Sequence, residues 1–454
     1  MFFAYQCMHL HTVQVLRALL FTIYKMKKTI RSLSWFIIAK LFCIHAFAQL
    51  VPLREDTLRI TMQDAEKQFI QKNFLLLAAK YRVSAADAAI IQARLYPNPN
   101  LSVDQGIYNP DTKKWVDLSS TGETAVSLQQ LIILASKRNK QIDIAKINSQ
   151  ISAYQFYDLI RTLRYELRSS FYSLYFLFEP MSVYDKEIES LKALIDVYTI
   201  QYNKGNIAFK ELARLQALQF SLQNERLDLL KQAAEKQMNL SLLTGDTLSR
   251  PINPIPDSDF INHIDVSILN YTQLLDSALI NRYDLKAANA QVQLNETNLA
   301  LQRSFRVPDI TIGINYDKAG SYVRNYNSLS LAIDLPFWNR NQGNIKIAQS
   351  QIEESRQLQT QVGLQVKAEI SKAYKQLLET DKLYKTASLQ FTTDYEKLLD
   401  GITKGYQNHS ISLLEFIDYY ETYKNSKLEF NRLQNNRLDA LENLNLATGT
   451  IILK

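Results

Sequence analysis

The chain has 454 residues, of which 46% are hydrophobic and 21% are charged, and its formal net charge is +7. Its 11 glycines and 10 prolines argue against a mostly β protein with many turns, because such turns depend on these two residues. Residues 1–48 hold six basic and no acidic residues, so the remainder carries a net charge of only +1 and gives no indication of nucleic-acid binding.

Residues 1–48 have the pattern of a secretory signal peptide with an over-extended start. Met26 begins the sequence MKK, which is followed by an apolar run over residues 35–47 and the small-residue pattern AFA. This order of basic, apolar and small residues is typical of a signal peptide, and Met26 is the expected true start. A membrane anchor is the alternative, but the run is too short for a hydrocarbon core of about 30 Å and Lys40 interrupts it.

The following sequence predicts a first structural repeat over residues 49–248. We expect a helix at about Thr61–Leu95, then strands at about 100–108 and 123–132. A very long helical stretch comes next, from Ser136 to Tyr202, and a tight turn leads from it into a return helix.

The strands of this repeat alternate between apolar residues and small or polar ones. Leu101, Val103 and Ile107 fall on one face of the first strand, with serine, aspartate and glycine at the positions between them. Such alternation suits a strand of a membrane β-barrel. A half-buried hairpin of a soluble protein has the same period, so the pattern alone leaves both readings open.

The long helical stretch extends for about 100 Å, because each of its roughly 65 residues adds about 1.5 Å. A helix of this length must pack against other long helices in a coiled-coil-like array. Apolar residues such as Ile147 and Ile151 are separated by polar ones, which could line a water-filled tube or face solvent in an ordinary coiled coil. Pro180 should kink or end the helix, since it removes one backbone hydrogen bond.

A second structural repeat is expected over residues 267–454, after a proline-containing linker at 249–266. The sequence Leu-Leu-Thr-Gly that ends at Gly245 recurs as Leu-Ala-Thr-Gly ending at Gly449, and such self-similarity indicates a duplicated unit. The second repeat is predicted to contain a helix at about Tyr271–Arg303, strands at about 309–317 and 327–335, and a long helical stretch over Asn339–Tyr406.

The four predicted strands are too few to close a membrane barrel. Bacterial single-chain barrels have at least about eight strands, and unpaired strand edges in lipid cost several kcal/mol for each backbone group. If the strands cross a membrane, several copies of the chain must therefore contribute to one barrel.

Two further pieces of sequence are specific: LPFWNRNQGNI at Leu335–Ile345 and the turn YNKGNI at Tyr202–Ile207. In these pieces and in its duplicated order of elements the chain resembles the TolC-type outer membrane factor family, in particular its heavy-metal and drug efflux branch. The resemblance covers essentially the whole mature chain. It implies a mostly α fold with a small membrane β-barrel contribution, in which a homotrimer forms a 12-stranded β-barrel and a long α-helical periplasmic barrel.

The resemblance also implies partners and a location. The expected partners are a periplasmic adaptor protein, an inner-membrane pump and outer-membrane lipid. Nucleic acid is not an expected partner. The expected location is the outer membrane of a Gram-negative bacterium, with a large periplasmic part.

Two turns between the long helices match the family's periplasmic tips, which contact the adaptor. His409 replaces the glycine of the first turn, so the second contact is expected to be atypical. Asp400 stands where some relatives narrow the closed tunnel with acidic residues, although a solvated carboxylate is the alternative reading. The expected adaptor-contacting residues are Tyr202, Lys204, Gly205, Asn206, Ile207, Tyr406, His409, Ser410 and Ile411.

The sequence contains no constellation typical of catalysis, so we expect no enzyme, no catalytic residue, no cofactor and no metal ligand. The histidines of the mature chain, His263 and His409, stand in unrelated contexts. The predicted function is the outer-membrane channel subunit of a tripartite, RND-type efflux system, a passive conduit for metal cations or small toxic compounds. The alternatives are the channel of a type I protein secretion system and a periplasmic coiled-coil structural protein.

Overall fold

The computed structural model divides the chain into two compact units, Met1–Asp56 and Thr57–Lys454. The residues that the structure describes all belong to the second unit. They are residues 57–453 without 247–249, 258–260, 262–263, 320–322, 391–400, 407 and 409. The predicted signal segment 1–48, with its expected start at Met26, lies outside the described residues.

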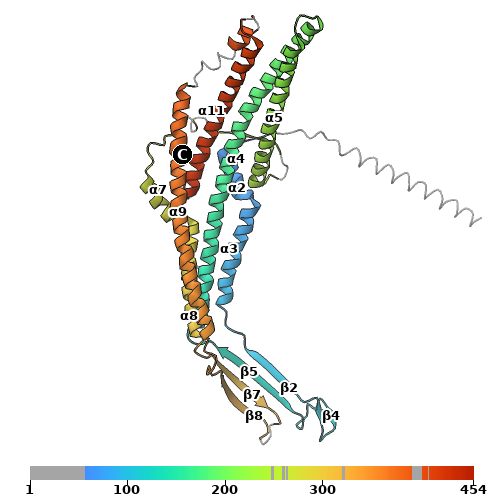
Figure 1. The fold of residues 1–454 in the computed structure, drawn as a ribbon. Coiled ribbons are helices and arrows are strands. Elements are labelled where there is room, and N and C mark those ends of the chain that lie inside the picture. The colour runs from blue at the N-terminus through green and yellow to red at the C-terminus, as the bar shows by residue number, and fades with distance from the viewer. Residues whose placement is uncertain are drawn as a thin grey trace, which may run out of the picture. The chain divides into compact units, whose positions relative to one another are not determined.

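The second unit consists mainly of long helices, and short strands interrupt the helices along the chain (Figure 1). In chain order the elements are β1 (Leu58–Thr61), α2 (Met62–Lys72), α3 (Phe74–Ala93), β2 (Asn100–Gln105), β3 (Tyr108–Asn109), β4 (Lys114–Trp115), β5 (Thr124–Ile132), α4 (Lys137–Asn203), α5 (Phe209–Thr244), β6 (Ile252–Ile255), α7 (Tyr271–Asn281), α8 (Tyr283–Ser304), β7 (Ile310–Asp317), β8 (Tyr326–Ile333), α9 (Gln342–Gln390) and α11 (Leu413–Thr448).

The longest helix, α4, packs against α3, α5, α8 and α11 (Figure 1). Its 67 residues add about 1.5 Å each, so it extends for about 100 Å. The expectation that Pro180 could end this helix is wrong, because α4 continues through Pro180, which is buried. Packing against neighbouring helices on both sides of the proline outweighs the one backbone hydrogen bond that it removes.

The helix predicted at Thr61–Leu95 is in fact two helices, because the chain breaks between α2 and α3 at Asn73. Asn73 has an extended backbone with φ −63° and ψ 119°. Its side-chain oxygen accepts a hydrogen bond from the amide of Leu76 at 3.0 Å, and its side-chain nitrogen donates to the carbonyl of Leu243 at 3.1 Å. Asn73 therefore starts α3 and ties it to the end of α5, a contact that we call the first joint.

The helix predicted at Tyr271–Arg303 breaks in the same way between α7 and α8 at Arg282, where φ is −68° and ψ is 121°. The Arg282 side chain is only 2% exposed. Its guanidinium forms ion pairs with Asp284 and Glu369 and donates a hydrogen bond to the carbonyl of Ala447 at 3.2 Å. These contacts tie α8 to α9 and to the end of α11, and we call them the second joint.

A glycine with positive φ ends the helix that meets each joint. Gly245 follows α5 with φ 67° and Gly449 follows α11 with φ 75°, a conformation that glycine adopts without strain. A Cβ atom on Gly245 would lie 2.7 Å from the carbonyl oxygen of Lys72, whereas one on Gly449 would lie 3.4 Å from Cγ of Arg282. The first joint is therefore the more tightly packed of the two.

The main hydrophobic core lies close to the two joints and draws side chains from α2, α4, α5, α7, α9 and α11. Phe69, Phe171 and Ile370 are completely buried in it. Strand β1 pairs in parallel with β6 beside this core. Because β6 lies within the predicted linker 249–266, part of that linker is an ordered strand rather than a free connection.

A four-stranded antiparallel sheet continues from the bundle, with the strand order β2-β5-β7-β8 (Figure 1). Strand β2 ends at Gln105, before the predicted end at residue 108. The chain then forms the small hairpin of β3 and β4, with the rings of Tyr108 and Trp115 5.2 Å apart. The last strand, β8, ends at Ile333 rather than at the predicted residue 335.

Candidate functional site

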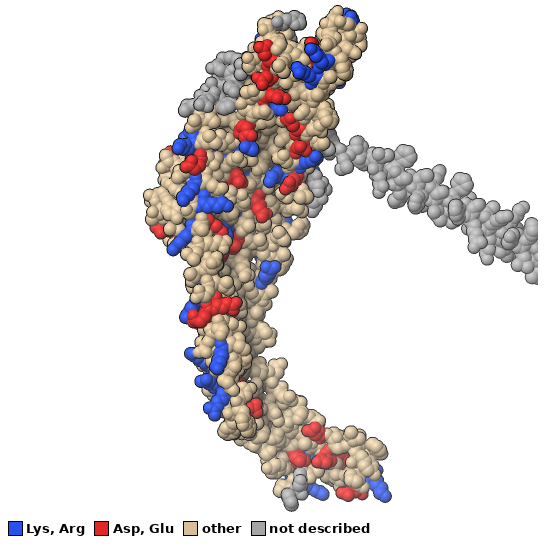
Figure 2. Space-filling model, viewed as in Figure 1, with Lys and Arg blue, Asp and Glu red and all other residues tan. Residues whose placement is uncertain are grey.

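One face of the four-stranded sheet is apolar and exposed. The register places Leu101, Leu128, Ile314 and Leu329 in one row across the strands. Leu329 is 78% exposed and Leu101 is 65% exposed. Figure 2 shows this part of the molecule as largely uncharged, with charged side chains gathered toward its far end. Water is an unfavourable solvent for such a face, so an apolar medium or a partner must cover it.

The opposite face of the sheet is small and polar. The row next to the leucines holds Ser102, Ser127, Asn315 and Ser328, with a 2.9 Å hydrogen bond between the two serine hydroxyls of β2 and β5. Gly313 belongs to this face, and a Cβ atom there would lie 2.6 Å from the hydroxyl oxygen of Ser330. The two faces thus differ in the way expected of a sheet between lipid and water.

The two outer strands of this sheet, β2 and β8, each pair with only one neighbour among the described residues. Backbone groups at such edges need partners, and inside a membrane water cannot supply them. The sheet of one chain is therefore incomplete as a membrane-spanning structure, and strands of other copies are the natural partners for its edges.

The first predicted tip is a tight exposed turn between α4 and α5. Gly205 has φ 74° and open space where a Cβ atom would lie. The amide of Asn206 donates to the carbonyl of Gln201 at 2.9 Å, which closes the end of α4. Tyr202 is 41% exposed, Lys204 is exposed and Ile207 is partly buried, so most side chains of this turn lie on the surface.

The second predicted tip is built differently, although its sequence aligns with the first. The hydroxyl and amide of Ser410 both donate to the carbonyl of Gly405, at 2.7 and 2.8 Å. Ser412 then starts α11 with a reciprocal capping arrangement involving Glu415. Ser410 is exposed and Ile411 is partly buried, whereas His409 and Asp400 lie outside the described residues.

Tyr406 lies inside the molecule, although the aligned Tyr202 lies on its surface. Tyr406 is 7% exposed, its ring stacks on Phe416 at 4.6 Å, and its hydroxyl contacts that of Tyr198. Burial and the contact with Tyr198 raise the pKa of Tyr406, so the phenol stays neutral at physiological pH. Tyr406 thus holds the second turn against α4.

Sequence reasoning missed the cluster to which Tyr406 belongs, which we call the tip cluster. A signal was present, since the buried α4 members recur at spacings of seven and four residues, as in a coiled-coil seam. The buried members of the tip cluster are Tyr184, Leu191, Ile195, Leu212, Leu215, Leu218, Leu222, Ile402, Tyr406, Phe416 and Tyr420.

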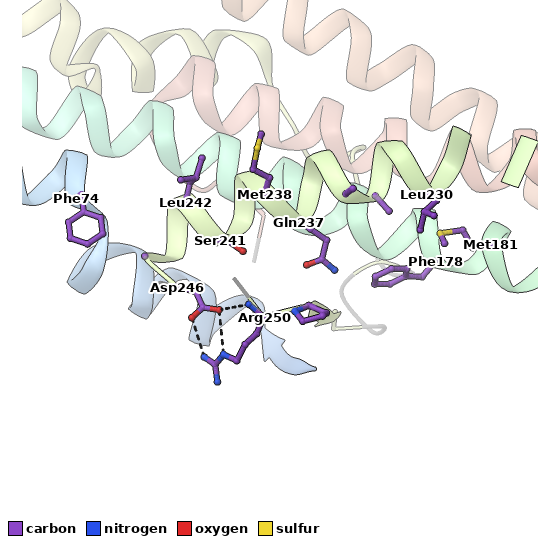
Figure 3. Close-up of a pocket in the computed structure, with 14 residues that line it drawn as sticks. Phe74, Phe178, Met181, Leu230, Gln237, Met238, Ser241, Leu242, Asp246 and Arg250 are labelled. Atoms are coloured by element: carbon purple, nitrogen blue, oxygen red, sulfur yellow. Dashed lines mark hydrogen bonds and ion pairs between the residues drawn. The ribbon is translucent and has the colours of Figure 1, made fainter. Parts of the chain in front are cut away.

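An apolar cavity of about 700 Å³ lies beside the first joint (Figure 3). Phe178, Met181 and Leu230 line one end of it, and Asp246 pairs with Arg250 at 3.4 Å near the other. The charged groups on its wall therefore satisfy each other, and the cavity lacks the convergent polar groups that orient a bound small molecule.

The described residues also show two negative findings. None of the helices in the described ranges combines the length and apolar character that crossing a bilayer requires. Within the same ranges, no three His, Cys, Asp or Glu side chains are grouped so that they could hold a metal ion.

A bundle of long helices that continues into a sheet with one apolar and one polar face defines the class of protein as an outer-membrane channel subunit. The chain belongs to the outer membrane efflux protein family, whose sequence model matches residues 66–246 and 274–450. The cobalt-zinc-cadmium resistance protein CzcC of Cupriavidus metallidurans is 20% identical over 377 residues, which are 83% of this chain and 87% of that protein.

Solved outer-membrane channels have the same fold. The CmeC channel of Campylobacter jejuni gives a TM-score of 0.70 at 14% identity, covering 86% of each chain. The MtrE channel of Neisseria gonorrhoeae gives 0.68 at 15% identity, covering 86% of this chain and 89% of that one. The protein VceC of Vibrio cholerae gives 0.66 at 16% identity, covering 86% and 96%. These likenesses confirm the predicted fold class, and family and fold are those of channels.

Proposed function

We propose that the chain is the outer-membrane subunit of a tripartite efflux system and a passive conduit for small toxic solutes. The observation that carries this proposal is the four-stranded sheet. One exposed face is apolar and fits lipid, the other is polar and fits a water-filled lumen, and both edges are open. A coiled-coil structural protein of the periplasm would have no use for such a sheet.

Three copies would complete the sheet as a barrel of about twelve strands, because the open edge of β8 in one copy can pair with β2 of the next. The long helices of the three copies would then continue the lumen into the periplasm. The cargo is suggested by the relative named for cobalt, zinc and cadmium resistance, and we infer divalent metal cations as the cargo of this chain. An inner-membrane pump would supply the energy, since a passive conduit supplies none.

The turn between α4 and α5 and the turn before α11 lie at the end of the bundle away from the sheet (Figure 1), and they are the proposed contact with a periplasmic adaptor. In the first turn Tyr202, Lys204, Gly205, Asn206 and Ile207 support this, because they form an exposed turn of fixed backbone. In the second turn we propose Ser410, Ile411 and His409 as the contacts with the adaptor. The buried Tyr406 would hold this turn in position from within the tip cluster.

The sheet can be tested with one variant on each of its faces. Leu329→Arg puts a charge on the apolar face, at a cost of about 2–4 kcal/mol in lipid, whereas Ser328→Arg puts the same charge on the polar face of the same strand. Outer-membrane fractions should lose the first variant and retain the second. Equal recovery of both, or recovery of the unaltered chain in the soluble periplasm without detergent, would contradict the proposal.

The cargo and the tip contact have their own tests. Cells that carry the chain with its adaptor and pump should tolerate more cobalt, zinc and cadmium than cells lacking the chain, and unchanged tolerance would exclude these cargoes.

The contact with the adaptor can be tested at the first turn. Lys204→Glu should weaken capture of the purified adaptor, whereas Lys231→Glu, at an exposed position of α5, should not. Equal capture by both variants would move the contact away from this turn.

A further inference from the structure

A carboxylic acid is buried at the seam between α4 and α11, within the tip cluster. Glu187 of α4 is 5% exposed, and neither of its carboxylate oxygens forms a hydrogen bond of good geometry. The hydroxyl of Tyr420, from α11, lies beside it and is likewise unsatisfied. An unpaired buried carboxylate is costly, and a group in this position gains stability by taking up a proton.

One cation that acts on Glu187, Lys424, is already paired with another acid. Nζ of Lys424, from α11, bonds to the carboxylate of Glu225, from α5, at 2.7 Å. The hydroxyl of Tyr184, from α4, donates to the same oxygen of Glu225 at 2.7 Å. Glu225 therefore occupies two groups that could otherwise have paired with Glu187.

The described groups that face Glu187 set its titration. Burial raises its pKa to about 7, the hydroxyl of Tyr420 and the charges of Lys424 and Lys427 oppose this rise, and the charge of Glu225 adds to it. Helical residues 401–406 add the phenol of Tyr406, which stays neutral. Glu187 thus changes charge near neutral pH.

The seam has room for movement next to this acid. A cavity of about 370 Å³ adjoins Glu187 and is lined by Leu191, Leu218, Thr403 and Phe416. Helices beside an empty volume can separate with fewer lost contacts than helices in a filled core. The seam joins the α4–α5 hairpin to α11, so a shift here displaces one tip turn relative to the other.

We propose that Glu187 is a proton-controlled latch: when protonated it keeps α11 seated on α4, and when ionised it drives the two helices apart. The latch rests on the proposed channel function only for its consequence, which is opening of the tip end. In the separated seam the carboxyl is hydrated and its pKa returns to the ordinary value of 4.5. At a pH between 4.5 and about 7, the closing of the seam is therefore coupled to the uptake of a proton by Glu187.

The direction of the effect follows from the raised pKa of the closed seam. Below pH 4.5 both states are protonated and the closed seam has its full stability, which falls as pH rises and reaches its minimum above about pH 7. The ratio of open to closed seams should rise on the order of a hundredfold over this range.

The latch can be tested with paired spin labels on the full-length protein in lipid. Cys7 and Cys43 are the two cysteines of the chain, and both are first replaced by serine. Glu189→Cys on α4 and Glu421→Cys on α11 then provide unique labelling sites at exposed positions. Distances measured from pH 5 to 8.5 should show a longer population that grows with a midpoint near 7. A distance distribution that does not change with pH would overturn the latch.

Two variants of Glu187 identify the titrating group. Glu187→Gln and Glu187→Leu carry no charge and should stay closed at every pH, and the apolar variant avoids a buried amide without partners. Asp196→Asn, at an exposed site on the same helix, should leave the pH response intact. A response that survives both Glu187 variants would assign it to another group. Conductance across a lipid bilayer tests the channel function separately from the latch. A protein that conducts ions but whose seam does not respond to pH would refute the latch and leave the channel function standing.

Discussion

The two joints of the bundle share a backbone conformation and differ in chemistry. At the first, Asn73 accepts from its own helix and donates to the carbonyl of Leu243, without any charge. At the second, Arg282 donates to the carbonyl of Ala447, a position equivalent to Leu243, and also pairs with carboxylates of α8 and α9. The same helix break can thus be held by a local cap or by an ion-pair network between helices.

The difference determines what each joint connects. The amide of Asn73 is short, so the first joint links α3 only to α5 and depends on close packing against Gly245. The longer guanidinium of Arg282 reaches α9 as well, and Asp284 also lies 3.8 Å from Arg161 of α4. We therefore expect the free energy of unfolding to fall when the charge of Arg282 is removed at the second joint, and when a side chain is added at Gly245 at the first joint.

The largest effect is expected from removing the charge of the second joint. Arg282→Met leaves Asp284 and Glu369 without their main partner, and such losses cost about 3–5 kcal/mol in buried pairs. The lower end applies here, because the two carboxylates are 26% and 38% exposed and water can reach them. Urea unfolding of the detergent-purified protein measures the loss. Arg282→Lys should recover part of it, and a cost below that of Asn73→Ala would contradict the comparison.

The two glycines test packing at otherwise equivalent positions. Gly449→Ala should cost about 1–2 kcal/mol for its left-handed backbone alone. Gly245→Ala should cost about 3 kcal/mol, because its Cβ atom would also press on the backbone of Lys72, 2.7 Å away. Urea unfolding compares the two variants. Equal losses in the free energy of unfolding would show that the first joint accommodates an added methyl group as easily as the second.

A smaller effect is expected from removing the cap of the first joint. Asn73→Ala deletes the acceptor for the amide of Leu76 and the donor to Leu243, at a cost of about 1–2 kcal/mol. Asn73→Asp keeps the acceptor and loses the donor, so its unfolding midpoint should fall between those of Asn73→Ala and the unaltered protein. A midpoint below that of Asn73→Ala would mean that the bond to Leu243 is the main contribution.

The smallest effect is a difference in pH dependence. Burial alone would raise the pKa of Asp284, but Arg282 and Arg161 outweigh burial and hold it below its usual range. The resulting stability is present above the unfolded pKa of about 3.9 and is lost as pH falls through the folded value. The stability gap between the protein and Arg282→Met should therefore narrow toward pH 3, by about 1 kcal/mol or less because Asp284 is partly exposed. The gap for Asn73→Ala should stay constant over the same titration.

Sequence patterns were sufficient where a single residue type forces a local structure. Alternation placed Leu101 and Val103 on one face of the first strand of the sheet, and the glycine at Gly205 marked the turn after α4. They were insufficient at the helix breaks, because the acceptors for Asn73 and Arg282 lie 170 and 165 residues further along the chain. They also missed Glu187, whose spacing from Tyr184 and Leu191 puts it on the apolar seam, because an acid is normally assigned to the surface.

The sequence by itself determined the family, the long helices and a sheet with two unlike faces, because period and composition are local properties of the chain. Only the tertiary structure decided where the helices break, which of the aligned tyrosines Tyr202 and Tyr406 is buried, and that Glu187 is buried without a hydrogen bond of good geometry. These outcomes depend on which distant helix packs against each residue. Burial and pairing are properties of that packing, so equivalent positions in similar sequences can differ in both.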